Sequence, residues 1–144
     1  MRRLVTLVDL SEDSMDKLAE LASIRKCTEG TVLFSEGDHH DQLYFVVDGS
    51  LRLEMTTTQC GRQTILTVGS GDLLAWSAIL GDGTMTSTAV VNEPSQLIAI
   101  VASDLKNELE RDTVFGYEIM KVIAKSLSMR LLATRLQLLD LYHR

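Results

Sequence analysis

The chain has 144 residues, 45% of them hydrophobic, and a formal net charge of -6 at neutral pH. This length and apolar content fit one domain with a sizeable core, and the negative charge argues against a nucleic-acid-binding surface over the whole protein. No apolar run approaches the roughly 20 residues of a membrane span, and Asp9 interrupts the short apolar N-terminal stretch, so we expect neither a membrane anchor nor a signal peptide. Cys27 and Cys60 form no C-x-x-C pair, and we expect a cytoplasmic protein.

The N-terminal part, residues 1–29, is predicted to be a helical segment. Ser11 is a candidate N-cap, and acidic residues follow it in the first turn. Met15 and Leu18 then fall on one face of a short amphipathic helix that we expect to end near Ser23.

Residues 30–102 show short apolar runs separated by turn residues, which is typical of strands. Asp48-Gly49 is a strong hairpin signal, and Pro94 precedes the last run. Seven or eight strands at this spacing predict a mainly β fold with flanking helices, namely an eight-stranded jelly-roll β-barrel. Residues 71–91 within it read as a strand end, a short cassette helix, a Gly-rich turn and a second strand.

Residues 103–144 are predicted to be helical. Ser103 is a candidate cap for a short helix over residues 104–110, and Asp112 or Thr113 for a long helix that reaches about Tyr142. The long helix carries a heptad seam with one polar position. The seam residues are Met120, Ala124, Leu127, Leu131, Thr134, Leu138 and Leu141.

A second apolar side accompanies this seam. It consists of Ile119, Val122, Ile123, Leu132, Leu136 and Leu139. A helix buried on all sides in a monomer is one explanation, but a small domain rarely hides so long a helix completely. We therefore expect one side to pack on the barrel and the other to form a homodimer, with Met120, Leu127, Leu131, Thr134, Leu138 and Leu141 at the dimer interface.

This order of elements resembles the cyclic nucleotide-binding domain of the catabolite activator and protein kinase A regulatory families. Gly30, Gly37, Gly49 and Gly71 match the glycines at the turns of that roll, where glycine tolerates a positive φ. The resemblance covers nearly all of the chain. It implies a single domain over residues 1–144.

In the family, an early Glu of the phosphate-binding cassette accepts from the ribose hydroxyl, and a late Arg pairs with the cyclic phosphate. Against that pattern, Trp76 stands where the Glu belongs and Thr86 where the Arg belongs, while Ser87 matches a phosphate-contacting hydroxyl. No Arg or Lys occurs between Arg62 and Lys106. Because losing a charge-assisted contact costs about 1.5–3 kcal/mol, we expect a ligand of the cyclic nucleotide type to bind with weakened affinity.

Two further positions bear on the ligand. Trp76 either fills the former ribose pocket as core or forms an aromatic wall for a ligand. In the catabolite activator branch a Thr-Ser pair of the long helix reaches the purine; Thr134-Arg135 corresponds here, and Arg135 either lends a cation to the pocket or, as we favour, faces water. The candidate ligand-binding residues are Ala75, Trp76, Ser77, Thr86, Ser87, Thr88, Thr134 and Arg135.

Catalytic and metal-dependent alternatives find little support in the sequence. A metal-binding roll needs several histidines and a carboxylate, but only His39, His40 and His143 are present. Haem binding would rest on His39 or His40 without an attachment motif, and we expect this pair to face solvent. No arrangement typical of a catalytic nucleophile occurs, so we expect neither an enzyme nor a metal site.

The resemblance therefore favours a regulatory, small-molecule-sensing domain that signals through residues 120–141 to a partner protein. Two alternatives stay open. One is the sensor half of a transcription regulator of the catabolite activator type, and the other is a ligand-free protein-interaction module. Because no helix-turn-helix follows Tyr142, we expect no direct nucleic-acid binding by this chain.

Overall fold

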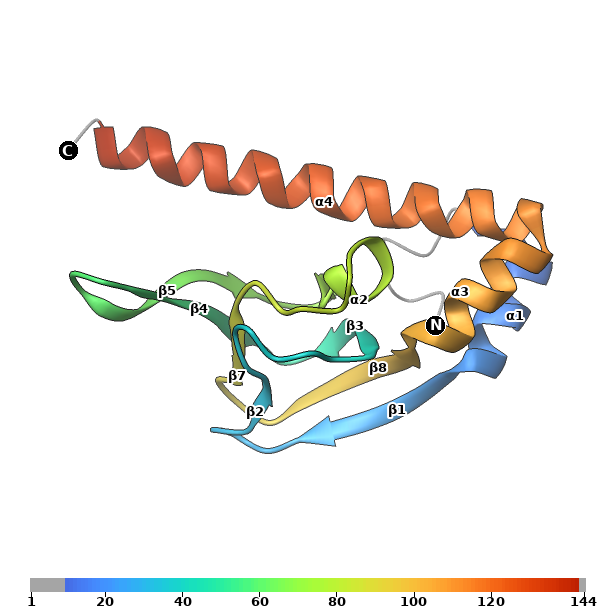
Figure 1. Ribbon diagram of the computed structural model, residues 1–144, viewed down its shortest axis with the longest axis horizontal. Helices are drawn as coiled ribbons and strands as arrows, with labels where there is room; N and C mark the ends of the chain where they lie inside the picture. Colours follow the sequence, from blue (N-terminus) through green and yellow to red (C-terminus); the bar gives the residue numbers. More distant parts are fainter. Residues whose placement is uncertain (1–9, 143–144) are drawn as a thin grey trace.

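The computed structural model describes residues 10–142 (Figure 1). Its helices are α1 (Glu12–Leu21), α2 (Ser77–Leu80), α3 (Ala102–Arg111) and α4 (Thr113–Tyr142). Its strands are β1 (Ala22–Cys27), β2 (Val32–Phe34), β3 (Gln42–Asp48), β4 (Leu51–Thr57), β5 (Gly61–Val68), β6 (Leu73–Leu74), β7 (Thr88–Val91) and β8 (Ser95–Val101).

The strands form two four-stranded antiparallel sheets, in the orders β1-β8-β3-β6 and β2-β7-β4-β5. Short turns carry the chain from one sheet to the other, as between β3 and β4 and between β7 and β8. The predicted hairpin at Asp48-Gly49 is therefore wrong, because β3 and β4 lie in different sheets and do not pair. The predicted fold, a mainly β roll with an N-terminal helix, a cassette helix and a long C-terminal helix, is confirmed.

Strand β1 lies inside the segment that the sequence predicts to be helical. Helix α1 ends at Leu21, before the expected end at Ser23, and the chain continues directly into the strand. Four of the six side chains of β1 are exposed, so no apolar alternation reveals it. Pairing with β8, from Ala22↔Ile100 to Cys27↔Ser95, defines this strand, and such long-range pairing is invisible to local patterns.

Two of the predicted helix caps are confirmed. The Ser11 side chain accepts from the backbone N–H of Ser14 at the start of α1. Asp112 Oδ1 accepts from the N–H of Phe115, 3.1 Å away, at the start of α4. Both contacts satisfy backbone donors that a helix leaves unpaired.

The predicted cap at Ser103 is wrong. Helix α3 already begins at Ala102, and no side chain caps it. The Ser103 hydroxyl instead donates to Asp41 Oδ2, 2.9 Å away, in the loop before β3. The hydroxyl therefore links α3 to the roll and does not cap the N-terminus of the helix.

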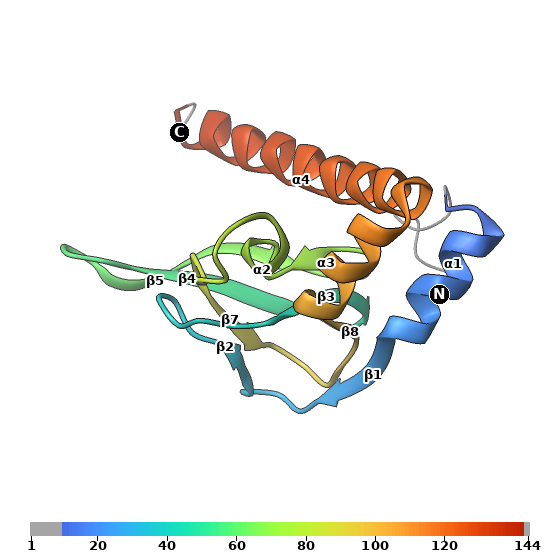
Figure 2. The ribbon, with the colours of Figure 1, turned by 45° about the vertical axis from the view of Figure 1, so that its right-hand side comes forward.

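Strand β3 separates two hydrophobic clusters because successive side chains point to opposite faces. Tyr44 and Val46 enter the interior of the roll, whereas Leu43 and Phe45 face the helices. The second cluster attaches the helices to the outer face of the roll, and Figure 2 shows α1, α3 and the first part of α4 on this side. Its α4 members are Phe115, Ile119, Val122 and Ile123.

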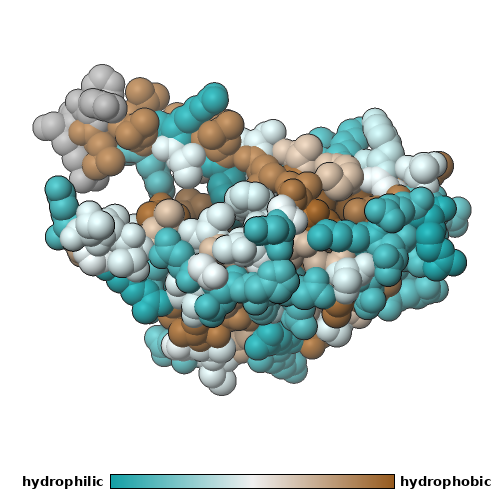
Figure 3. All heavy atoms as spheres, viewed as in Figure 1, coloured by the Kyte–Doolittle hydropathy of each residue, from teal (hydrophilic) through white to brown (hydrophobic). Residues whose placement is uncertain are grey.

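Helix α4 packs on the roll by its first half only. From residue 131 onward every described side chain of α4 is exposed. The predicted second apolar side is therefore divided along the helix, since Ile119, Val122 and Ile123 are buried and Leu132, Leu136 and Leu139 are not. In Figure 3 hydrophobic residues cover the far half of α4, above a hollow over the roll. Within residues 10–142, no helix is long and apolar enough to cross a membrane.

Glu118 of α4 fastens α1 to the long helix. Its carboxylate accepts hydrogen bonds from the Ser14 hydroxyl and, over 3.0 Å each, from the N–H and hydroxyl of Ser11. These bonds, the one from Ser14 first, hold the pKa of Glu118 below its usual range. The carboxylate thus prefers its charged form in the folded protein.

This depressed pKa predicts an acid-sensitive link between α1 and α4. A carboxyl whose pKa is lower in the folded state stabilises it above the unfolded pKa, about 4.3, and loses that effect as pH falls through the folded value. We expect Glu118→Gln to flatten the fall in the free energy of unfolding below about pH 4. Urea titrations between neutral pH and pH 3 measure this slope. The exposed Glu110→Gln is the control, and equal slopes in both variants would contradict the link.

Candidate functional site

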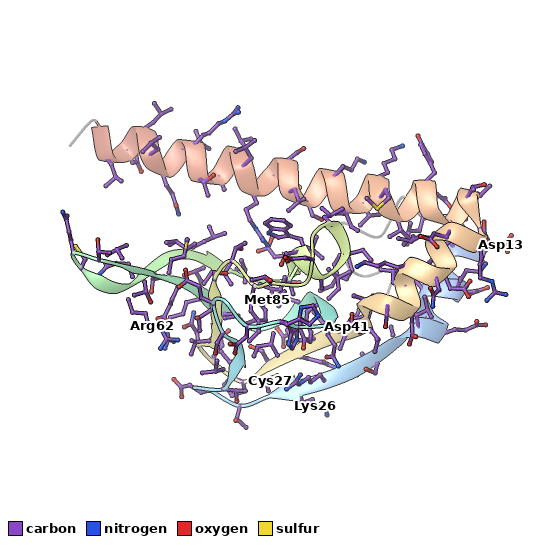
Figure 4. All side chains as sticks on the ribbon, in the orientation of Figure 1. Asp13, Lys26, Cys27, Asp41, Arg62 and Met85 are labelled. Carbon is purple, nitrogen blue, oxygen red and sulfur yellow. The ribbon has the colours of Figure 1, made fainter. Side chains whose placement is uncertain are left out.

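The cassette over residues 71–91 lies between the roll and α4. It consists of β6, the short helix α2, the loop over residues 81–87 and β7. Figures 1 and 2 both show α4 crossing above α2. Met85, labelled in Figure 4, belongs to the cassette loop and is fully buried.

Hydrogen bonds give the cassette loop a defined shape. Ser77 Oγ donates to the carbonyl of Thr84 over 2.9 Å, and the N–H of Gly83 donates to the carbonyl of Ser77 over 3.0 Å. The N–H of Met85 donates to the carbonyl of Asp38 over 2.9 Å, which joins the loop to the segment before β3. The loop is thus held at both ends by backbone contacts, and Ser77 is already paired within the protein.

The backbone enters α2 through a left-handed residue. Ala75 has a φ of 63° and is the only non-glycine residue within residues 10–142 with a positive φ. Residues other than glycine rarely adopt this conformation, and they tend to do so at functional sites. The turn at Ala75 brings Trp76 to the start of α2, where its indole packs partly against the hydrophobic cluster under the helices.

A small pocket opens beside these residues. Its lining consists of Phe34, Leu53, Leu74, Ala75, Trp76, Ser77, Met85, Thr86, Ser87 and Arg130. The cavity has a volume of about 20 Å³. Since one water molecule needs about 10–15 Å³ by this measure, the closed pocket has room for about one water.

Five of the eight candidate ligand-binding residues meet at this pocket, namely Ala75, Trp76, Ser77, Thr86 and Ser87. Thr88 is not part of the lining. Its hydroxyl accepts from the N–H of Glu36 over 2.9 Å, which is a structural contact between β7 and the end of β2.

The predicted pair on the long helix lies outside the pocket. Thr134 and Arg135 are both exposed on α4, and the Thr134 hydroxyl donates to the carbonyl of Leu131 over 2.9 Å. In a single chain these residues face solvent, so contact with a pocket would require a second copy.

Arg130 supplies the cation that the cassette lacks. It projects from α4 into the pocket lining and donates a hydrogen bond to the carbonyl of Leu73 at the end of β6. Burial lowers the pKa of Arg130, and the nearby Asp72 carboxylate raises it. Because the ordinary pKa of a guanidinium lies far above neutral pH, the side chain stays charged there.

The two loop histidines differ in their surroundings, and among residues 10–142 no three metal-ligating side chains lie together. The expectation that both face solvent is wrong for His40. This residue is half-buried, its ring lies 5.6 Å from that of Phe34, and its Nε2 is 2.8 Å from the Tyr44 hydroxyl. His39 is exposed, and His143 lies outside the described residues.

Comparison with known proteins identifies the family. The sequence model of the cyclic nucleotide-binding domain matches residues 24–112, which is more than half of the chain. The chain belongs to the cyclic nucleotide-binding domain family. The predicted resemblance is therefore confirmed.

Solved structures agree with this assignment. A cyclic nucleotide-binding domain from Methylobacillus flagellatus superimposes with a TM-score of 0.85 at 19% identity, covering 92% of this chain and 74% of that one. The catabolite activator protein of Thermus thermophilus superimposes with a TM-score of 0.72 at 24% identity, covering 94% of this chain and 62% of that one. At these identities the likeness establishes the fold.

Two relatives found by sequence are much longer than this chain. Protein CNGC15a of Medicago truncatula is 35% identical over 72% of this chain, which spans 16% of that protein. The cyclic AMP receptor protein of Thermus thermophilus is 25% identical over 82% of this chain, which spans 55% of it. This chain therefore spans only part of the length of each of these relatives.

Sequence reasoning missed Arg130 within this cyclic nucleotide-binding domain. The search for a cation was confined to the cassette, where none occurs between Arg62 and Lys106. One signal was available, because Arg130 precedes the candidate Thr134 by four residues and so lies on the same side of a helix. Which residue of that side reaches the cassette depends on how α4 packs on the roll.

Proposed function

We propose that this chain is a non-catalytic regulatory domain that senses a small ligand in its cassette pocket and binds cyclic AMP and cyclic GMP weakly. The observation that carries this proposal is the lining of the pocket. Trp76 and Thr86 line it at the two positions where the family resemblance places a carboxylate and an arginine. An indole N–H donates where the carboxylate would accept, and a threonine hydroxyl carries no charge for the cyclic phosphate.

The size of the cavity supports weak binding. A volume of about 20 Å³ admits no nucleotide. A ligand must first displace Trp76, Arg130 or α4 itself, and the free energy of that opening is subtracted from its affinity. The same closed cavity favours a second candidate, a protein-interaction module without a ligand.

The output of the domain is proposed to pass through α4 to a second copy and to a partner protein. The far half of α4 exposes leucines that a lone chain leaves in water, and the heptad seam fits a second α4. Because this chain spans 55% of the Thermus receptor, the sensor half of a longer transcription regulator is a further form of the same proposal.

Titration with cyclic AMP and cyclic GMP tests the proposal. Trp76 is the only tryptophan and lines the pocket, so its fluorescence reports on the site itself. We expect no saturation below the millimolar range, with calorimetry as the check on binding that leaves the fluorescence unchanged. Saturable binding at micromolar concentration would overturn the proposal and restore a nucleotide sensor of high affinity.

A further inference from the structure

Arg130 is a partly desolvated cation held by a neutral partner. Among the described residues, its hydrogen bond goes to the Leu73 carbonyl, and no carboxylate lies within ion-pair distance. A guanidinium carries five N–H donors in a planar fork, and hydrogen bonds to an anion are about twice as strong as those to a neutral acceptor. The carbonyl therefore leaves most of the binding capacity of Arg130 unused.

A second polar group lies one turn earlier on the same face of α4. Ser126 is buried, and its hydroxyl is the one buried side-chain polar atom within residues 10–142 that has no hydrogen-bond partner. Residues four apart on a helix lie one above the other, so Ser126 neighbours Arg130 on α4, but it is not part of the pocket lining. An unpaired buried hydroxyl costs free energy unless a ligand or a water completes it.

The nearest competitor for Arg130 is Asp72. Its carboxylate raises the pKa of the guanidinium from a distance, but Oδ2 accepts from the N–H of Gly69 over 2.8 Å and is committed to the turn before β6. Asp72 thus favours the charged form of Arg130 without accepting a hydrogen bond from it.

We propose that α4 supplies the cation of this pocket: Arg130, assisted by the hydroxyls of Thr86 and Ser87, binds the oxyanion of a small acidic ligand. This inference rests on the proposed function, because it concerns the same pocket. It assigns the ligand class, an organic phosphate or carboxylate, and moves the charged contact from the cassette to the long helix.

The arrangement couples binding to α4. An oxyanion that takes the N–H donors of Arg130 competes with the Leu73 carbonyl, and this contact joins α4 to β6. Binding therefore exchanges a bond between α4 and the roll for a bond between α4 and the ligand. A ligand that favours one of two helix positions shifts the population toward that position.

Three probes and three variants test the inference in the full chain. The probes are cyclic AMP, neutral adenosine and inorganic phosphate, followed by Trp76 fluorescence and calorimetry up to millimolar concentration. The variants are Arg130→Gln, Arg130→Lys and, as a control that removes one charge elsewhere on α4, the exposed Lys121→Gln. Urea midpoints establish that each variant is folded.

We expect cyclic AMP to bind the wild type in the millimolar range, and adenosine to bind at least tenfold more weakly because it lacks the oxyanion. Arg130→Gln should weaken cyclic AMP binding about tenfold to a hundredfold, Arg130→Lys should restore part of it, and Lys121→Gln should leave it unchanged. Competition by inorganic phosphate would support recognition of a free oxyanion, and its absence would support recognition of the phosphodiester.

Three results would overturn the inference: no binding of any probe, equal binding by Arg130→Gln and the wild type, or an equal loss in Lys121→Gln. The proposed function fails differently, through micromolar affinity in the wild type. Micromolar binding that Arg130→Gln abolishes would refute weak binding and support the role of Arg130. Millimolar binding unaffected by Arg130→Gln would support weak binding and refute the role of Arg130.

Discussion

Replacing Leu131 and Leu138 together by glutamate is expected to convert a dimer of this domain into a monomer. The two side chains are 52% and 54% exposed in the single chain and occupy the heptad seam. Burying a leucine contributes about 1.5–3 kcal/mol, and a dimer loses the seam contacts of both copies while gaining facing carboxylates. We expect the dimer dissociation constant to rise at least ~100-fold, which corresponds to about 3 kcal/mol.

Sedimentation equilibrium over a range of protein concentrations measures this change. The matched control is Leu132→Glu with Leu139→Glu, since these leucines are 57% and 54% exposed but lie beside the seam. Both variants should keep the far-UV circular dichroism of the wild type, because none of the four leucines packs on the roll. Equal weakening by both pairs would show that the seam does not form the interface, and a monomeric wild type would remove the dimer from the proposed function.

Gly49→Ala is expected to destabilise the roll by about 3 kcal/mol. Gly49 joins β3 to β4 with a φ of +101°, and an added Cβ would lie 2.1 Å from Ser95 Oγ and 2.8 Å from Ser95 Cα. A left-handed conformation costs a residue with a Cβ about 1–2 kcal/mol, and overpacking a buried site adds about 1–3 kcal/mol. Ser95 cannot yield freely, because its hydroxyl accepts from Ser50 N–H at 3.2 Å and donates to the Glu93 carbonyl at 2.7 Å.

Gly61→Ala separates the backbone cost from the steric cost. Gly61 also has a positive φ, +68°, but an added Cβ would meet nothing within 4 Å. We expect Gly61→Ala to lower the free energy of unfolding by about 1–2 kcal/mol, clearly less than Gly49→Ala. Urea denaturation at unchanged m measures both. If the two variants lost the same stability, the contact with Ser95 would contribute nothing.

Most of the roll could be predicted because its signals are local. The turn at Asp48-Gly49, the cap at Ser11 and the start of α4 at Asp112 each depend on residues a few positions apart, although the turn joins strands of different sheets and forms no hairpin. Strand β1 was not predicted, because its exposed residues show no apolar alternation. Its partner, β8, lies some 70 residues later in the chain, with Ala22 opposite Ile100.

The candidate site could be predicted only in part, for the same reason. The cassette residues Ala75 to Ser77 and Thr86 to Ser87 form two short runs within one motif. The motif predicts that they meet at one pocket, as they do. Thr88 follows Ser87 directly in the sequence. Its hydroxyl, however, accepts a hydrogen bond from the N–H of Glu36 and does not line the pocket. Contact between the cassette and α4 has no such local signal.

By itself, the sequence determined the family, the eight-stranded roll and the long helix with its heptad seam, because glycine turns, alternation and periodicity act over short distances. Only the tertiary structure decided which part of α4 is buried and which of its side chains reaches the cassette. Phe115, Ile119 and Val122 anchor the first half of the helix on the roll. That packing sets the rotation of the helix and brings Arg130 to Leu73, 57 residues away in the chain.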